Sequence, residues 1–516
     1  MLWVILSFLT LGRIFYASRG FLSGPEAYLL LCGKRLDWGF IEGPAGVPAL
    51  IRLSTSLGGC GPFGVRVLSP CFLLLLSLTL WWIVSNLDGK RVAFWSVLAF
   101  NLLPLVNAAG LVMDGAMIVG TFWMIALAWS SLLASKAATT LSSWMFYGLV
   151  LAITTQVSYC VGWLLIVVIA MIIMRQSRFP WLGVGLALLL LAASWIGPLW
   201  WNFHNEWLQW SQMTWGSLWS YNFPAWSLVQ HSFVFWQFAF LIPLVVFSLT
   251  HALFFSQDQK KESNKNLSFS LLSVVPFVFC LAGVGHDAPS LGLQIVLWAM
   301  ILPNLINFFL QTRWRQYGGL SLLCVTGVIS CLVIFEMIPL RENSDNESLW
   351  SVPRRSGVSG VQKLALEILR LRALQKDNAP DSHSSSAPPF IIAQTPELAS
   401  LLGALLPIDY PELQGAPSVF TPESPAFSSQ FQLWPHYADA VASGFMDPLY
   451  TEEPMTSPFI GHRALYVTSE LAEDLPETIS GAFGAIIPVS RGTLERDHHS
   501  EEFMIYACEN YQMMSL

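Results

Sequence analysis

Residues 67–86 read VLSPCFLLLLSLTLWWIVSN, a run of apolar residues that contains no Asp, Glu, Lys or Arg. A helix needs about 20 predominantly apolar residues to cross the hydrocarbon core of a bilayer. This stretch therefore predicts a membrane-spanning helix, and the sequence on either side of it contains many more of the same kind.

The apolar runs together predict about eleven spans. The stretch 142–174 allows two readings, either two short spans broken near Gln156 or one long tilted helix. The apolar start Met1–Thr10 lacks a basic n-region and is interpreted as an uncleaved first span rather than a signal peptide. The predicted spans lie near residues 1–18, 67–86, 92–110, 115–135, 142–157, 159–174, 181–200, 231–255, 268–284, 289–310 and 317–338.

Composition separates the chain into two regions. Hydrophobic residues make up 54% of the chain and charged residues 11%, whereas a soluble domain carries about 25% charged residues. Residues 1–338 contain 16 Lys and Arg against 10 Asp and Glu, a net charge of +6, and residues 339–516 contain 10 against 23, a net charge of −13. The acidic region would repel phosphates, so no nucleic-acid partner is expected.

Loop charges predict the orientation of the spans. The loops at 110–114, 201–230 and 285–288 contain no Lys or Arg, so they are expected outside by the positive-inside rule. Eleven spans then place the C-terminal region outside as well. The first outer loop, 19–66, departs from the rule because it contains five cations. This departure indicates that these cations have a role other than setting the orientation of the spans. The cations of the alternate, cytoplasmic loops are Lys90, Arg91, Lys136, Arg175, Arg178, Lys260, Lys261, Lys265, Arg313 and Arg315.

The C-terminal region predicts a small α/β domain at residues 390–516. A helix at 361–376 and a Ser/Pro linker at 377–389 precede it, within a connecting segment that we place at 339–389. Alternation of strand and helix signals indicates the α/β class. The expected elements are short buried strands at Phe390–Ala393, Ala464–Thr468 and Ala485–Val489 and a helix at Glu397–Leu405. His498, His499, Glu501 and Glu502 are interpreted as a solvated polar turn, so no metal site and no cofactor are expected.

The informative polar groups lie in the outer loops. Asp114 stands alone at the outer end of the fourth span. An ionisable group at a membrane edge costs free energy unless it forms an ion pair or has a function, so Asp114 is a candidate functional residue. It could instead cap the N-terminus of that span. Nine tryptophans lie in the segment 195–236. They fit an aromatic belt at the membrane interface, or flat faces that stack on sugar rings or a prenyl chain.

The loop motifs, taken in order, resemble the GT-C superfamily of membrane glycosyltransferases. The bacterial members that they resemble are the protein mannosyltransferases (family 39) and the aminoarabinose transferase of lipid A. The motifs are Pro25-Glu26-Ala27-Tyr28, Leu36-Asp37-Trp38-Gly39-Phe40-Ile41-Glu42-Gly43-Pro44, Leu50-Ile51-Arg52-Leu53-Ser54-Thr55, Gly64-Val65-Arg66, Met113-Asp114, Pro198-Leu199-Trp200-Trp201-Asn202-Phe203-His204 and Gln430-Phe431-Gln432-Leu433-Trp434-Pro435.

The resemblance implies a fold and a set of site residues. The fold is a polytopic α-helical membrane domain at 1–338 with an extracytoplasmic C-terminal α/β domain, in the cytoplasmic membrane of a bacterium. The first outer loop is expected to form two short interfacial helices, near 25–34 and 46–57. The implied catalytic residues are Glu26, Asp114 and Glu42, and Trp201, Asn202 and His204 are implied at the substrate. Arg52 and Arg66, in the loop that departs from the positive-inside rule, could bind the donor phosphate or could instead extend to lipid headgroups.

Two departures from the family pattern bear on catalysis. Pro25 occupies the position of the usual catalytic base, and Gly43 that of the His or Lys that helps to hold the donor phosphate. Glu26, whose longer stem could reach the place of the missing aspartate, is the preferred base.

The resemblance implies transfer of a sugar from a polyprenyl-phosphate donor to an acceptor on the outer face. The partners are then the lipid-linked sugar, membrane lipid and an acceptor of unknown class. The alternative is a catalytically degenerate GT-C scaffold that binds lipid-linked sugar or a partner without transfer. A solute transporter fits less well, because transporters are expected to show internal repeats and broken helices at mid-membrane depth.

Overall fold

The computed structural model divides into two compact units. It describes residues 2–113, 115–134, 140–159, 166, 169, 180–209, 288–310, 313–334, 357–377, 388–424, 429–439, 441–442, 455–468, 475–496 and 499–512. The first unit comprises Met1–Arg19 and Leu36–Val352, and the second comprises Gly20–Arg35 and Pro353–Leu516. The sequence prediction kept the whole of the first loop with the spans, whereas in the structure part of that loop packs with the C-terminal region.

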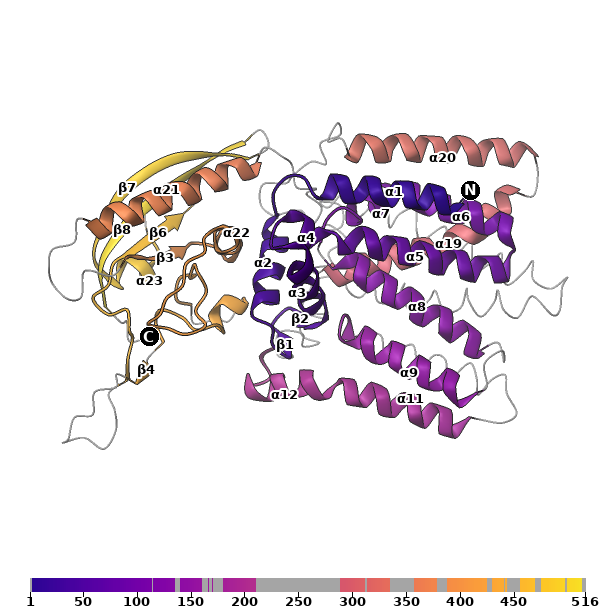
Figure 1. Cartoon of the computed structure of the whole chain (residues 1–516), viewed down its shortest axis with the longest axis horizontal. Coiled ribbons are helices and arrows are strands. Elements are labelled where there is room, and N and C mark those ends of the chain that lie inside the picture. The colour runs from indigo at the N-terminus through magenta and orange to yellow at the C-terminus, as the bar shows by residue number, and fades with distance from the viewer. Residues whose placement is uncertain are drawn as a thin grey trace, which may run out of the picture. The chain divides into compact units, whose positions relative to one another are not determined.

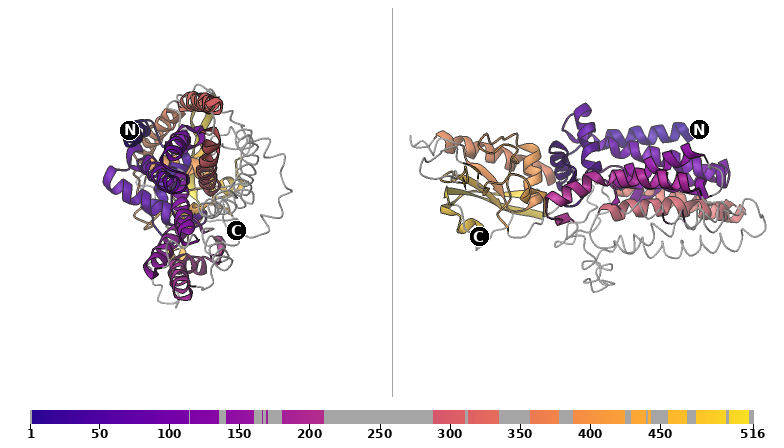
Figure 2. Two further views of the ribbon diagram at one scale, coloured as in Figure 1. Left: turned by 90° about the vertical axis from the view of Figure 1, so that its right-hand side faces the viewer. Right: turned by 90° about the horizontal axis from the view of Figure 1, so that it is seen from below.

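The first unit is a bundle of apolar helices (Figure 1). Helix α5 packs against α1, α6 and α8, and α9 packs against both α8 and α11. These helices run along roughly the same direction in Figure 1 and in the second view of Figure 2. The helices are α1 (Leu2–Ala17), α3 (Gly46–Gly58), α4 (Pro62–Arg66), α5 (Leu68–Leu87), α6 (Lys90–Leu102), α7 (Pro104–Ala109), α8 (Ala116–Ala134), α9 (Leu141–Thr155), α11 (Trp181–Ser194), α12 (Ile196–His204), α19 (Ala288–Leu310) and α20 (Arg313–Ile334).

Eight of the predicted spans lie on described helices. The spans predicted at 231–255 and 268–284 fall outside the described residues, as does nearly all of 159–174. By length and composition, three helices of the described part could cross a membrane: Pro62–Leu87, Ala116–Leu133 and Trp181–His204. The helical membrane character of the chain is therefore confirmed, and the number of eleven spans stays a prediction.

A polar cluster lies inside the first unit where one predicted span is broken. Pro104 separates α6 from α7, and because proline lacks an N–H it interrupts the helical hydrogen-bond pattern. The buried Arg13 of α1 donates to the backbone carbonyl of Asn101 (3.0 Å) and to the side-chain oxygens of Asn101 (2.9 Å) and Asn107 (2.7 Å). Asn101 in turn donates to the Ser77 hydroxyl (2.9 Å). Arg13 therefore holds together the helices on either side of the break.

The second unit contains a four-stranded mixed sheet in the order β3-β6-β8-β7. Strand β3 pairs with β6 in parallel, and β8 pairs antiparallel with both β6 and β7. The elements are α21 (Gly357–Asp377), β3 (Phe390–Ala393), α22 (Pro396–Leu405), a 3-10 turn (Gln430–Gln432), β4 (Val441–Ala442), β5 (Met455–Thr456), β6 (Ala464–Thr468), α23 (Glu477–Ser480), β7 (Phe483–Arg496) and β8 (His499–Tyr511). The helices predicted at 361–376 and 397–405 and the first two predicted strands are confirmed.

The prediction for the third strand was wrong about burial. Ala485–Val489 lies within β7, at the edge of the sheet, and Ile487 and Val489 are exposed. A short apolar run does not distinguish a central strand from an edge strand, because the pattern contains no information about what covers it.

An aromatic cluster fills the core of the second unit. The ring of Phe390 lies within 6.1 Å of the rings of Phe420, Tyr437, Phe459 and Tyr511, measured between centroids. Beside this cluster the Tyr511 hydroxyl donates to Glu423 (3.0 Å), which is 9% exposed. Burial raises the pKa of the Glu423 carboxyl above its ordinary value.

Helix α2 (Gly24–Lys34) of the first loop belongs to the second unit. It packs against α22, and the ring of Tyr28 lies 6.1 Å from that of Phe431. Arg35, which follows the helix, donates to the carbonyls of Gly415 (3.3 Å) and Ala416 (2.7 Å). The helix predicted near 25–34 is thus confirmed, and so is the one near 46–57, which is α3. Their predicted interfacial location stays a prediction.

Candidate functional site

A short hairpin carries the Asp37–Pro44 motif in the first unit. Strands β1 (Gly39–Phe40) and β2 (Gly43–Pro44) pair antiparallel, with Phe40 opposite Gly43. Ile41 and Glu42 form the two-residue turn between them, and Glu42 is exposed. The hairpin therefore presents one of the predicted catalytic carboxylates at its tip.

Helix α12 and the residues after it hold this hairpin. The Trp201 indole N–H donates to Asp37 Oδ2 (2.9 Å), and the Gln209 side chain donates to the Phe40 carbonyl (2.8 Å). A methyl group on Gly39 would lie 3.1 Å from the Trp201 ring, so the hairpin backbone rests directly on the indole. Trp201 and Gln209 are both buried.

The hairpin leads into α3, which is fixed at its start. The Gly46 N–H donates to the Gln156 carbonyl (2.7 Å) at the end of α9. Arg52 lies on the exposed side of α3, whereas Ile51 and Ser54 are buried. Among the described residues no hydrogen bond or ion pair involves the Arg52 guanidinium, which leaves it available for an anion.

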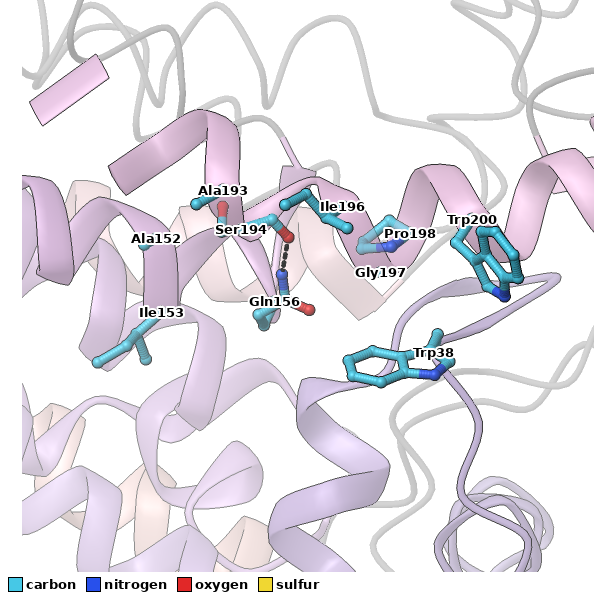
Figure 3. A pocket seen from close by; sticks show the side chains of 10 residues that line it. All are labelled: Trp38, Ala152, Ile153, Gln156, Ala193, Ser194, Ile196, Gly197, Pro198 and Trp200. Carbon is cyan, nitrogen blue, oxygen red and sulfur yellow. Dashed lines mark hydrogen bonds between the residues drawn. The ribbon is translucent and has the colours of Figure 1, made fainter. Parts of the chain in front are cut away.

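An open apolar groove of about 640 Å³ lies on α9, α11 and α12, beside the start of the hairpin. Its lining includes Trp38, Ile153, Gln156, Ser194, Ile196 and Trp200. Figure 3 shows Trp38 and Trp200 at one end and Ile153 at the other, with the Gln156 amide donating to the Ser194 carbonyl between them. The groove can therefore accept an apolar ligand, and it offers few polar groups.

The predicted catalytic residues belong to different units of the structure. Glu42 lies in the first unit and Glu26 in the second. Glu26 is 0% exposed and occupies the first turn of α2, where its Oε2 accepts from the backbone N–H (2.9 Å) and the hydroxyl (3.0 Å) of Ser23. Asp114 lies outside the described residues. Its neighbour Gly115 approaches Val47 of α3.

The two predicted phosphate partners differ in environment. Arg66 is 2% exposed, and its guanidinium donates to the carbonyls of Ala17 (3.3 Å) and Arg19 (3.2 Å) at the end of α1. Cations near a helix C-terminus stabilise the free carbonyls there. Arg66 thus has a structural use, and Arg52 is the more accessible of the two.

The three predicted substrate residues also differ. Asn202 is buried and donates to the Gln209 side chain (2.8 Å), so it and Trp201 support the hairpin from beneath. His204 is exposed, and its ring centroid lies 4.2 Å from that of Trp200. Within the described part of the chain, no three His, Cys, Asp or Glu residues are grouped to hold a metal ion.

Sequence reasoning missed three supporting residues: Asp37, Gln156 and Gln209. Asp37 lies inside the Leu36–Pro44 motif, but nothing in that motif indicates that its carboxylate accepts a hydrogen bond from Trp201. Gln156 was considered only as a break between spans. Gln209 gave no signal, because a lone glutamine among tryptophans does not reveal which backbone carbonyl it meets.

This architecture is a helical membrane fold with an exposed carboxylate at the tip of a loop hairpin and an apolar groove lined by Trp38 at the start of that hairpin. Residues 42–196 match a family model described as dolichyl-phosphate-mannose-protein mannosyltransferase. The predicted resemblance to membrane mannosyltransferases is confirmed over these residues.

The chain is similar over almost its whole length to ArnT from Cupriavidus metallidurans. The crystal structure of that protein in the apo state has a TM-score of 0.55 with 13% sequence identity, covering 98% of this chain and 97% of that chain. The same figures hold for the structure of that protein bound to undecaprenyl phosphate. The Archaeoglobus fulgidus oligosaccharyltransferase has a TM-score of 0.43 with 10% identity, covering 78% of this chain and 61% of that chain. No curated protein matches this sequence.

Proposed function

We propose that this protein transfers a sugar from a polyprenyl-phosphate donor to an acceptor on the outer face of the cytoplasmic membrane. The observation that carries the proposal is that one unit contains both an exposed carboxylate at the tip of the hairpin and an open apolar groove lined by Trp38 at the start of that hairpin. The similar fold of ArnT, a protein whose structure has been determined with undecaprenyl phosphate, supports the choice of donor.

The transfer requires a base and a cation. A carboxylate takes the proton from the acceptor hydroxyl, and the freed oxygen bonds to C1 of the sugar. The bond between C1 and the phosphate oxygen breaks, and polyprenyl phosphate leaves with the electron pair. A cation near that phosphate stabilises the developing charge.

Glu42 is the base that the geometry favours. Glu42 is exposed, whereas Glu26 is 0% exposed and one of its oxygens already accepts two hydrogen bonds. Arg52 is the cation proposed at the donor phosphate, because it is exposed on the helix that follows the hairpin. Asp114 is proposed as a second carboxylate of the site on the strength of the family motif.

The test is transfer from a radiolabelled polyprenyl-phosphate sugar by the wild type and by Glu42→Gln. Removal of an essential base lowers the rate on the order of a hundredfold or more. Glu477→Gln is the matched control, because Glu477 is exposed on α23 of the second unit. Equal transfer rates for wild type and Glu42→Gln would show that Glu42 is not the catalytic base.

The degenerate scaffold remains the second candidate, and one observation favours it. Pro25 stands where the family has its usual catalytic base, and it lies in the first turn of α2 beside the capping residue Glu26. A wild-type protein that binds the donor, yet transfers no sugar to any lipid, glycan or peptide acceptor tested, would establish the scaffold instead.

A further inference from the structure

One wall of the groove comes from the first loop and not from a span. Trp38 precedes β1, yet its indole lines the groove together with residues of α9, α11 and α12. The ring lies against Gly197 of α12, where a methyl group would come within 2.6 Å of Trp38 Cε3. The position of this ring therefore determines how wide the groove is at that end (Figure 3).

A single carboxylate fixes Trp38 to α12. Asp37 Oδ1 accepts from the Trp38 backbone N–H (2.7 Å), and Oδ2 accepts from the Trp201 indole N–H (2.9 Å). Asp37 thus joins the residue that lines the groove to the buried residue beneath the hairpin. Hydrogen bonds to a charged group are stronger than those between neutral groups, so the two hydrogen bonds to Asp37 restrict the position of Trp38 relative to Trp201.

The groove suits an isoprenoid chain. Trp38 is 65% exposed and Trp200 is 60% exposed, and Ile153 and Ile196 add further exposed apolar surface. The groove runs along Trp181–His204, one of the helices long and apolar enough to cross a membrane. A chain that enters it gains close van der Waals contacts with these apolar side chains, which is what favours binding next to lipid.

We propose that this groove holds the first isoprene units of the donor and that Asp37 is a positioning residue that sets Trp38 as its wall. This inference rests on the proposed function, because it assigns the donor's chain a place beside the hairpin. Asp37 acts through Trp38 and Trp201 and takes no part in the proton transfer.

The first experiment locates the chain. A polyprenyl-phosphate analogue with a diazirine in its first isoprene units is photolysed with the full-length protein, and the labelled peptides are identified by mass spectrometry. Labels are expected on the segments that contain Ile153 and Ile196. A wild type that transfers sugar but is labelled elsewhere would refute the groove assignment, whereas a wild type with neither label nor transfer would refute the proposed function.

The second experiment tests Asp37 with two donors. In Asp37→Asn the amide oxygen replaces only one of the two carboxylate acceptors, and Trp201→Phe keeps an aromatic ring, smaller than the indole, but removes the N–H donor. Both variants should raise KM for the long-chain donor about tenfold while kcat changes little, as expected for lost binding of substrate and transition state alike. A short donor whose phosphate carries a methyl group in place of the isoprenoid chain has nothing to enter the groove, so it should be insensitive to both substitutions.

Two controls make the outcome decisive. Asp88→Asn, after α5, and Trp82→Phe, an exposed tryptophan on α5, alter the same residue types away from the groove. They should leave KM unchanged for both donors. Equal losses for long and short donors in Asp37→Asn and Trp201→Phe would indicate general damage to the fold and would overturn the positioning role.

Discussion

Glu26 and Pro25 have a structural use at the start of α2. Ser23 and Glu26 form a reciprocal capping box, and Pro25 lies in the first turn, where its missing N–H costs nothing. Pro25, which replaces the family's usual base, and the neighbouring Glu26 thus both stabilise the helix that packs on α22.

Removing the cap should destabilise the second unit. Glu26→Ala is expected to lower its free energy of unfolding by about 1 kcal/mol, with Glu26→Gln closer to wild type because a glutamine can still accept from Ser23. Cys508, which is buried in β8, reports the opening through its rate of thiol labelling, read by mass spectrometry. Identical labelling rates in Glu26→Ala and wild type would show that the cap contributes nothing.

Glu423 makes the second unit sensitive to pH. Burial raises the pKa of its carboxyl above the ordinary value of 4.5, so the folded state retains a proton that the unfolded state has lost. Stability therefore falls as pH rises from about 4.5 through the raised pKa. His436 has the opposite slope, because burial lowers its pKa below 6.5 and the folded state favours the neutral ring.

Glu423→Gln isolates the glutamate contribution. The amide oxygen can still accept from Tyr511, and the group no longer titrates. The stability of the variant relative to wild type should increase from pH 4.5 upward and then level off. Cys508 labelling of both proteins at each pH measures the difference, since the pH dependence of the thiol itself cancels. A difference that is constant with pH would contradict the proton linkage.

At the scale of elements, the Arg13 cluster holds the broken α6–α7 pair to α1. Arg13→Met leaves the side-chain oxygens of Asn101 and Asn107 without their donor. Buried groups left unsatisfied cost about 1–3 kcal/mol each, so a clear drop in melting temperature in detergent is expected. Arg13→Lys should not restore stability, because an ammonium group cannot reproduce the planar fork.

The control for this cluster is a cation on the surface of the same unit. Arg315 is exposed and lies 4.2 Å from the centre of the Phe308 ring. Arg315→Met should change the melting temperature little. Equal melting temperatures for the Arg13 and Arg315 variants would mean that the cluster does not support the bundle.

Elements were predictable where the pattern was local. Apolar runs located α1, α5 and α8, and the spacing of Leu50, Ile51 and Leu53 located α3. The break at Pro104 lay within a predicted span and went unnoticed, because the residue that compensates for it, Arg13, is distant in sequence. The contact of Asp37 with α12 was not predictable for the same reason, because its partner Trp201 is 164 residues away in the sequence.

At the scale of the whole molecule, the second unit constrains the topology. Residues 20–35 and 353–516 form one compact unit, so both segments must lie on the same side of the membrane. If α1 crosses once, an even number of spans must lie between them, and the total is odd. This parity agrees with the eleven predicted spans without establishing the number.

Reporter fusions test this arrangement. A fusion near residue 260 should report the cytoplasm, whereas fusions near residues 28 and 400 should both report the outside. Sidedness that differs between residues 28 and 400 would be incompatible with the second unit as a single body. Agreement between residues 260 and 400 would refute the orientation predicted from the loop charges.

The packing of α2 on α22 also has a consequence for synthesis. Roughly 350 residues separate the two helices, which at 5–20 residues per second amounts to roughly 20 to 70 s of translation. Throughout that interval the face of α2 that carries Ala27, Leu30 and Leu31 has emerged from the ribosome without its partner. The nascent chain must therefore keep this face covered by lipid or by a chaperone until α22 arrives, and a chain that stops short of β3 can never complete the unit.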